Sequence, residues 1–131
     1  MKEQDDAKVE NALKKYNVLF DLVPASILLS TLDEGRIIEC NDGFLQMTGH
    51  TRDRALGTTT SELGFWSLDQ DRGRFIKQYE SFGSFKDVEL EYWQADGTKK
   101  TALAASRVIP VDGHEYALSI MYDMSSRKHG A

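Results

Sequence analysis

The first segment of the chain carries its apolar residues at a helical spacing. From Glu3 to Leu22 there is no Gly or Pro, and apolar positions recur at i, i+4, i+7 and i+11. These positions are Val9, Leu13, Tyr16 and Phe20. The spacing predicts an amphipathic helix over residues 1–22 that ends before Pro24. Because the stripe is narrow and the other faces are charged, the helix packs either on its own domain or on the same helix of a second chain.

A short hairpin and a short helix follow. The apolar run Ile27–Leu29 and the β-rich run Arg36–Cys40 flank an acidic turn that ends at Gly35, and this pattern predicts a hairpin. Asn41 is suited to cap the start of a helix, because its side chain can accept a free backbone N–H. Gly49 is suited to end that helix, because glycine readily adopts a left-handed conformation.

The middle of the chain is helical. Residues 51–63 are polar and interrupted by Gly57, which predicts small helical turns. Residues 69–81 predict a longer helix, whose apolar face is formed by Phe75, Ile76 and Tyr79.

The last third alternates between apolar and polar positions and predicts strands over 85–94, 101–111 and 116–122. The pairs Asp96-Gly97 and Asp112-Gly113 separate these runs and are strong hairpin signals. Three strands joined in this way form an antiparallel meander. Together with the first hairpin they predict five strands, and the class is α+β.

Composition narrows the picture to one acidic domain. The chain has 131 residues, with 16 Lys and Arg against 21 Asp and Glu, so its formal charge is −5. This balance argues against nucleic acid and membrane surfaces as partners. The single cysteine, Cys40, cannot form an internal disulfide. No apolar run reaches the roughly 20 residues of a membrane span, and the charged N-terminus is not a signal peptide. We therefore expect a cytoplasmic location.

Motifs of catalysis are missing from the sequence. There is no GxxxxGK, HExxH, CxxC or GxSxG. The three histidines, His50, His114 and His129, are far apart and lack the spacing of metal ligands. Glu89 and Glu91 share one strand face, where carboxylates usually meet solvent or a basic neighbour. We expect neither an enzyme nor a metal site.

An ordered set of short motifs resembles the PAS domain family. Asn41–Phe44 and Met47–His50 are similar to the family's N-x-x-F-x-x-x-T-G-Y helix, with His50 at the usual Tyr. The other matches, in chain order, are Phe20-x-x-x-Pro24, Gly35-Arg36-Ile37, Leu56-Gly57, Glu89 with Asp96-Gly97-Thr98, Asp112-Gly113 and Asp123–Lys128. The resemblance covers residues 18–128, and seven motifs in order are specific for the fold.

The resemblance implies a fold and a role. The fold is a five-stranded antiparallel sheet in spatial order 2-1-5-4-3 with helices on one face, in addition to the N-terminal helix. The chain would consist of that helix at 1–22, a PAS core at 23–124 and the start of a linker at 125–131. The role would be a non-catalytic sensory module in a longer signalling protein, with a covalently linked effector such as a histidine kinase or a diguanylate cyclase.

The same resemblance argues against two cofactors. Flavin-binding relatives use a cysteine in a motif resembling G-x-N-C-R-F-L-Q, whereas Phe44-Leu45-Gln46 lacks the Asn-Cys and Cys40 ends a predicted strand. Haem-binding relatives commonly supply a histidine from the long helix or the next strand, and residues 69–94 contain none. A small organic ligand remains open.

In the family, the space between helices and sheet is often a ligand pocket. The candidate pocket walls are Ile27, Leu29, Phe44, Met47, Trp66, Phe75, Tyr79, Val88, Leu90, Tyr92, Leu103, Leu118 and Ile120. Trp66, Tyr79 and Tyr92 would be its polar handles, and His50 would close its mouth. The close packing of protein interiors favours the alternative that these residues only fill the core.

The segment after the last strand is the expected signal relay. Asp123 stands at a helix N-cap position, Ser125 lies near the first turn, and Arg127 follows Asp123 at helical pairing distance.

A different class of function is also open. In that reading the chain is a ligand-free interaction domain that forms a homodimer through the N-terminal helix and the outer sheet face around Trp93.

Overall fold

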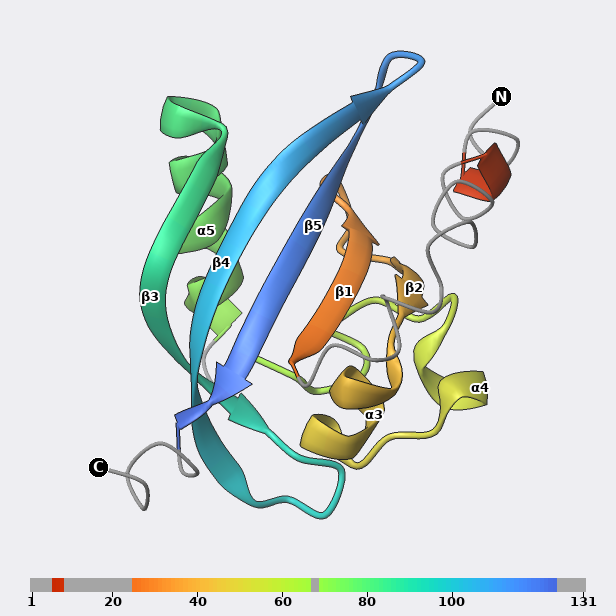
Figure 1. Ribbon diagram of the computed structural model, residues 1–131, viewed down its shortest axis with the longest axis vertical. Coiled ribbons are helices and arrows are strands. Elements are labelled where there is room, and N and C mark those ends of the chain that lie inside the picture. The colour runs from red at the N-terminus through yellow and green to blue at the C-terminus, as the bar shows by residue number, and fades with distance from the viewer. Residues whose placement is uncertain (1–5, 9–24, 67–68, 125–131) are drawn as a thin grey trace.

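The computed structural model describes residues 6–8, 25–66 and 69–124. Its centre is an antiparallel sheet of five strands in the order β2-β1-β5-β4-β3 (Figure 1). The strands are β1 (Ser26–Thr31), β2 (Ile37–Cys40), β3 (Ser84–Trp93), β4 (Lys99–Val111) and β5 (His114–Asp123). The predicted hairpin, meander and sheet order are confirmed.

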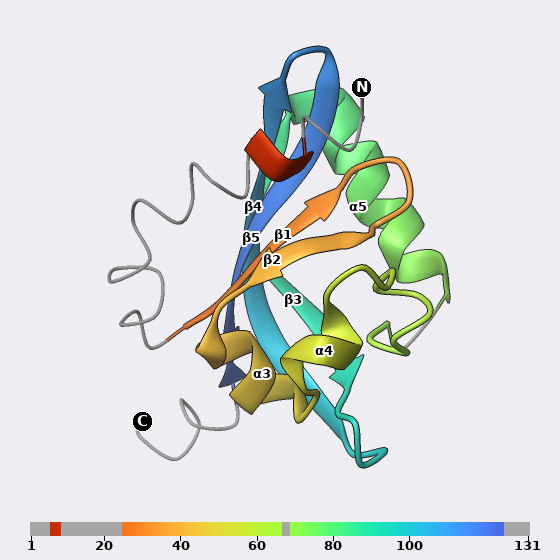
Figure 2. The ribbon, with the colours of Figure 1, turned by 90° about the vertical axis from the view of Figure 1, so that its right-hand side faces the viewer.

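Three helices form a layer on one face of this sheet. They are α3 (Asp42–Thr48), α4 (Arg52–Ala55) and α5 (Asp69–Phe82), and the edge-on view of Figure 2 shows all of them on the same side. The two predicted caps of α3 are confirmed, since Asn41 accepts from the Phe44 N–H and Gly49 is left-handed. The predicted helix at 69–81 is confirmed with one more residue at its end.

The side chain of Asn41 joins the sheet to the helical layer. It is fully buried, and its Oδ1 accepts hydrogen bonds from the backbone N–H of Ile27 at 2.8 Å and of Phe44 at 3.0 Å. Its Nδ2 donates to the carbonyl of Ala25 at 2.9 Å. A Cβ on Gly43 would lie 2.3 Å from that carbonyl oxygen, so only glycine allows α3 to sit this close to β1. One amide thus fixes the start of β1 and the start of α3.

A bulge in β3 decides which of its side chains face the helices. Phe85 pairs with Ser106 and Val88 with Ala104, so three steps along β3 match two along β4. The extra residue falls beside Asp87, whose φ is 56°. Because the bulge absorbs one residue, Phe85 and Val88 both point to the helical layer.

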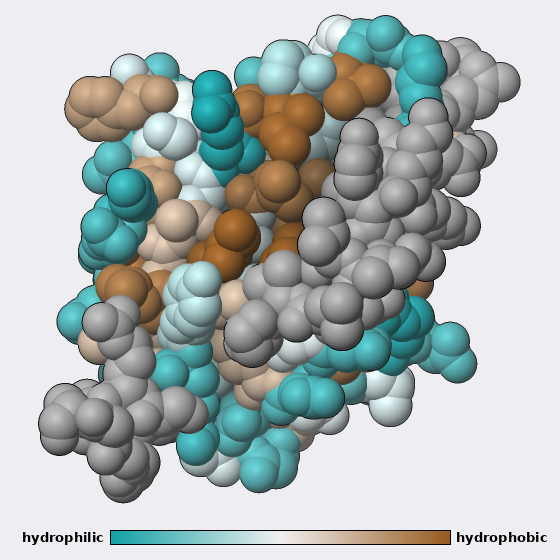
Figure 3. All heavy atoms as spheres, viewed as in Figure 1, coloured by the Kyte–Doolittle hydropathy of each residue, from teal (hydrophilic) through white to brown (hydrophobic). Residues whose placement is uncertain are grey.

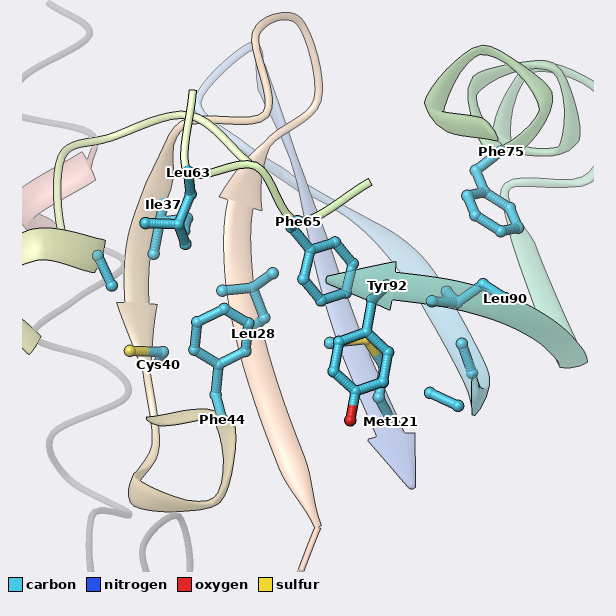
Figure 4. Packing of buried hydrophobic residues seen from close by; sticks show 13 residues of the cluster. Leu28, Ile37, Cys40, Phe44, Leu63, Phe65, Phe75, Leu90, Tyr92 and Met121 are labelled. Carbon is cyan, nitrogen blue, oxygen red and sulfur yellow. The ribbon is translucent and has the colours of Figure 1, made fainter. Parts of the chain in front are cut away.

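The main core lies between sheet and helices and is rich in aromatic rings (Figure 4). Phe65 stacks on Tyr92 with 5.5 Å between ring centroids and tilts against Phe44 at 6.2 Å. Phe75 of α5 stacks on Phe85 at 4.7 Å. These rings fill most of the space between the two layers and hold α5 against β3.

The structure corrects which face of the central strands points to the helices. On β5, Ser119 and Met121 face the helical layer, whereas Leu118 and Ile120 lie on the opposite face. The same correction applies to Ile27, Leu29 and Leu103. The predicted alternation is right, but on β4 and β5 the larger aliphatic residues are on the outside. The aromatic rings already occupy much of the inner space, so β4 and β5 offer smaller or flexible side chains there, while β1 adds Leu28.

The outer face of the sheet is therefore apolar as well, and Figure 3 shows hydrophobic side chains gathered over it. A second buried cluster consists of Leu29, Ile38 and Tyr116, with Val111 and Leu118 packed against it. Trp93, Ile120 and Tyr122 remain 37%, 37% and 49% exposed.

Residues 6–8 lie at the same end of the sheet as the β4–β5 turn. Residues 6–8 form a helical turn, in which the buried Asp6 accepts hydrogen bonds from the Tyr116 hydroxyl and, at 2.6 Å, from Arg36. Lys8 pairs with Asp112 at 2.8 Å. The apolar stripe at Val9, Leu13, Tyr16 and Phe20 lies outside the described residues, as do Ser125 and Arg127.

The amide of Asn41 is expected to be a major source of stability. Asn41→Ala would leave the Ile27 N–H and the Ala25 carbonyl without their present partner and would remove the cap at Phe44, whose N–H keeps only the Asn41 carbonyl at 3.1 Å. We therefore expect a loss of about 3 kcal/mol in unfolding free energy, measured by urea denaturation. Thr51→Ala is the control, because Thr51 caps the short and exposed helix α4. Its loss should stay at about 1 kcal/mol or below. Equal losses in the two variants would contradict the role given to Asn41.

Candidate functional site

A small cavity lies between the sheet and α5. Its volume is about 50 Å³, which suits one or two waters or a molecule of very few heavy atoms. Its apolar walls come from both layers and include Leu28, Phe75, Leu90 and Met121. Ala104 and Ala117 also line it, and the space exists because these strand positions carry small side chains. The core is therefore mostly but not completely filled.

Two hydroxyl groups on one wall of the cavity, those of Tyr79 and Ser119, are joined by a third on Ser106. The Tyr79 hydroxyl lies 2.6 Å from Ser106 Oγ, and Ser106 Oγ lies 2.9 Å from Ser119 Oγ and 3.2 Å from the carbonyl of Leu118. Burial raises the pKa of the Tyr79 phenol, while its hydrogen bonds to the serines and the charge of Arg72 lower it. The phenol therefore stays protonated at neutral pH. Elsewhere on the wall, the indole of Trp66 donates to Thr60 at 2.9 Å.

Arg72 stands where the cavity meets the surface. It lines the cavity and also a surface groove of about 670 Å³ between α5, the β1–β2 turn and β5. Its Nη2 donates to the carbonyl of Leu32 at 2.8 Å, so the side chain crosses from α5 to the β1–β2 turn. A Cβ on Gly35 would lie 2.7 Å from Arg72 Nε, so glycine makes room for this crossing.

The predicted pocket residues separate into three groups. Trp66, Phe75, Tyr79 and Leu90 line the cavity. Phe44, Met47, Val88 and Tyr92 belong to the adjoining core and do not border the cavity. Ile27, Leu29, Leu103, Leu118 and Ile120 lie on the outer face. The structure thus keeps four of the thirteen proposed residues at the cavity, and neighbouring positions take the place of those proposed on β1, β4 and β5.

Sequence reasoning missed several residues of the cavity wall. Leu28, Ser119 and Met121 are the neighbours of positions that had been expected there, so a change of face by one residue would have found them. Arg72 gave no signal in the sequence, because a charge near the start of a helix usually points to solvent.

His50 does not close the cavity. It follows α3, is 9% exposed and is not among the residues that border the cavity. Its Nδ1 has no hydrogen-bond partner among the described residues. Burial, with the positive charge of Arg54, lowers the pKa of the imidazole. The ring is therefore neutral at pH 7 and serves as a packed side chain.

The described residues include no metal site, no accessible cysteine and no membrane-spanning helix. Within residues 6–8, 25–66 and 69–124 no three His, Cys, Asp or Glu side chains come together as metal ligands. Cys40 is fully buried in the core cluster, away from the cavity lining. None of the helices in these ranges has the length and apolarity to cross a bilayer.

The end of the last strand lies near a buried phenol. Tyr92 is fully buried, and its hydroxyl points to the carbonyl of Met47 at 3.5 Å. Burial raises the pKa of Tyr92 to about 12, and the negative charge of Asp123 contributes to the rise. Asp123 is the last residue of β5 and pairs with Ala102. The end of β5 is therefore electrostatically coupled to the core beside α3.

These features define a class of small α+β domains, in which an antiparallel sheet and a helical layer enclose a cavity. A family model described as PAS domain matches residues 24–126. The chain belongs to the PAS domain family, as its sequence motifs had indicated. None of the curated protein sequences matches the chain.

Solved structures share this fold at low sequence identity. A PAS domain from Colwellia psychrerythraea has a TM-score of 0.75 and 22% identity, covering 88% of this chain and 99% of that one. A PAS domain from a two-component sensor histidine kinase has a TM-score of 0.74 and 10% identity, covering 88% and 98%. A third, in complex with ethanol, comes from a LuxR-family transcriptional regulator of Burkholderia thailandensis. Its TM-score is 0.69 at 17% identity, with coverage of 84% and 97%.

The raised pKa of Tyr92 makes a prediction for alkaline pH. The unfolded chain ionises this phenol near pH 10, whereas the folded chain holds the proton to about pH 12. The contribution of the protonated Tyr92 phenol to the unfolding free energy is fully present below pH 10 and is lost as the pH rises from 10 to 12. Tyr92→Phe should flatten this fall in unfolding free energy, measured by urea denaturation between about pH 9 and 11.5. An unchanged slope in Tyr92→Phe would count against the assignment.

Proposed function

We propose that this domain is a non-catalytic sensory module that binds a small molecule in the cavity between sheet and α5. The observation that carries the proposal is a group of three linked hydroxyls beside a mostly apolar space. Ser119 and Tyr79 border that space, and Ser106 links them. A cavity that were only a packing defect would have apolar walls and would stay empty.

The size of the cavity restricts the ligand. A volume of about 50 Å³ is far smaller than a flavin or a haem, which supports a proposal restricted to smaller ligands. The Burkholderia PAS domain forms a complex with ethanol, so a fold of this kind is compatible with a two-carbon ligand. A small organic molecule with a polar head and a short apolar part is the ligand that we propose.

The proposed route of the signal is β5. This strand borders the cavity with Ala117, Ser119 and Met121 and ends at Asp123. A ligand that shifts these side chains changes the strand that leads into the C-terminal segment. We propose Asp123, Ser125 and Arg127 as the relay to a covalently linked effector in a longer cytoplasmic signalling protein. A PAS domain of a sensor histidine kinase shares the fold, which makes a histidine kinase a reasonable effector.

A second candidate is a dimerisation domain that binds no ligand. The outer sheet face favours it, because Trp93, Ile120 and Tyr122 expose large apolar side chains there. The homodimer would use this face together with the N-terminal stripe. The two candidates differ in whether a molecule stays bound to the purified chain.

Filling the cavity should abolish ligand binding without unfolding the domain. Ala104→Val adds two methyl groups at the cavity wall, and Ala105→Val adds them on the opposite face of the same strand. Native mass spectrometry should show a retained small molecule on the wild type and on Ala105→Val, and none on Ala104→Val. If the wild type and both variants carry no small molecule and have twice the monomer mass, the result would instead support the second candidate, a dimerisation domain.

The relay predicts a separation of output from stability. Asp123→Ala in the full-length parent protein should impair the control of the effector, while the unfolding free energy of the domain changes by less than about 1 kcal/mol. Asp53→Ala is the control, because Asp53 is an exposed carboxylate on α4, far along the chain from β5. Normal effector control in Asp123→Ala would remove Asp123 from the proposed relay.

A further inference from the structure

Arg72 has unused binding capacity at the entrance of the cavity. A guanidinium carries five N–H donors and matches a carboxylate with two parallel hydrogen bonds. Among the described residues, the one hydrogen bond recorded for the Arg72 side chain goes to the neutral carbonyl of Leu32. No ion pair joins Arg72 to a carboxylate in that part of the chain. The half-buried guanidinium of Arg72 is therefore hydrogen-bonded to a single neutral carbonyl among the described residues.

The hydroxyl wall can meet a ligand oxygen as donor or as acceptor. Tyr79, Ser106 and Ser119 carry three protons, and the two contacts through Ser106 use two of them. The third proton either goes from Ser106 to the carbonyl of Leu118 or turns, on Tyr79 or Ser119, toward the cavity. The wall therefore adapts to a carboxylate oxygen without leaving a buried group unpaired.

The charges outside the cavity limit the ligand to a single negative charge. The surface groove next to Arg72 carries three carboxylates, Asp33, Glu80 and Glu115, together with His114. These carboxylates repel a second negative charge that would extend into the groove. The inner walls at Leu28, Leu90 and Met121 accept a short apolar tail instead.

We propose that the cavity takes a short-chain monocarboxylate, which Arg72 holds by its carboxylate while the apolar tail points inward to Leu90 and Met121. This inference rests on the proposed function and names its ligand class. On binding, N–H donors of the guanidinium that have no partner among the described residues gain a charged acceptor, which is stronger than a neutral carbonyl. The bond from Nη2 to the Leu32 carbonyl stays in place and keeps the side chain directed across the cavity entrance.

The test compares propionate with 1-propanol, its neutral counterpart, by calorimetric titration of the purified chain. Propionate should bind the wild type, and Arg72→Gln should weaken that binding by about tenfold or more. Arg74→Gln is the matched control, because Arg74 lies on the same helix, stacks over the Phe75 ring at 5.8 Å and borders neither the cavity nor the groove. It should bind propionate like the wild type. Malonate and phosphate should bind at least about tenfold more weakly than propionate.

Several results would overturn the inference. Equal propionate affinity in Arg72→Gln and the wild type would remove Arg72 from the site. If Arg72→Gln does not fold, propionate binding to Ala104→Val provides a second test, because this variant keeps the arginine and fills the cavity. Propionate binding that survives Ala104→Val would place the anion in the outer groove and contradict the proposal. Binding of 1-propanol without propionate would overturn the ligand class but leave the sensory function intact. Absence of both, with no molecule retained in native mass spectrometry, would overturn both proposals.

Discussion

The close contact between β1 and the start of α3 is the constraint on which the helical layer depends. Asn41 follows β2 directly, and its buried amide binds the backbone at Ala25, Ile27 and Phe44. These bonds fix the direction in which the chain leaves the sheet. Gly43 then lets the first turn of α3 rest on the Ala25 carbonyl. The position of α3 against the sheet thus depends on one amide and one missing methyl group, while Phe65 is held over the sheet by the hydrogen bond from the Trp93 N–H to its carbonyl at 3.0 Å.

The space between the layers is a second constraint, and it explains the cavity. Phe44, Phe65, Phe75 and Tyr92 fill most of that space, and β4 and β5 face it with small or flexible side chains. Around Ala104, Ala117 and Ser119 the rings do not close the space, and a gap of about 50 Å³ remains. Burial of a hydroxyl group requires a partner, and the three hydroxyls at Tyr79, Ser106 and Ser119 provide partners for one another. The polar wall and the gap both arise because β4 and β5 carry small side chains at this place.

Local chemistry was predictable from the sequence, and tertiary packing was not. The caps at Asn41 and Gly49 and the Asp-Gly turns depend on neighbouring residues, and the structure has them as expected. The inward face of β5 depends on what packs against it. Leu118 and Ile120 are more hydrophobic than Ala117 and Ser119, so hydrophobicity alone points to the wrong face. The role of Arg72 depends on Leu32, forty residues earlier in the chain, and no local pattern reports such a contact.

The arrangement of the central strands connects the cavity to both ends of the domain. β1 and β5 are neighbours in the sheet, with Ser26 opposite Met121 and Leu28 opposite Ser119. Residues of both strands border the cavity. β1 is the first strand after the N-terminal segment, and β5 is the last before the C-terminal one. Under the proposed function, a ligand that changes the packing of Leu28, Ser119 or Met121 therefore acts on both strands at once. Because β1 and β5 are joined by a continuous ladder of pairs from Ser26–Met121 to Thr31–Tyr116, a shift in one strand would be carried to the other.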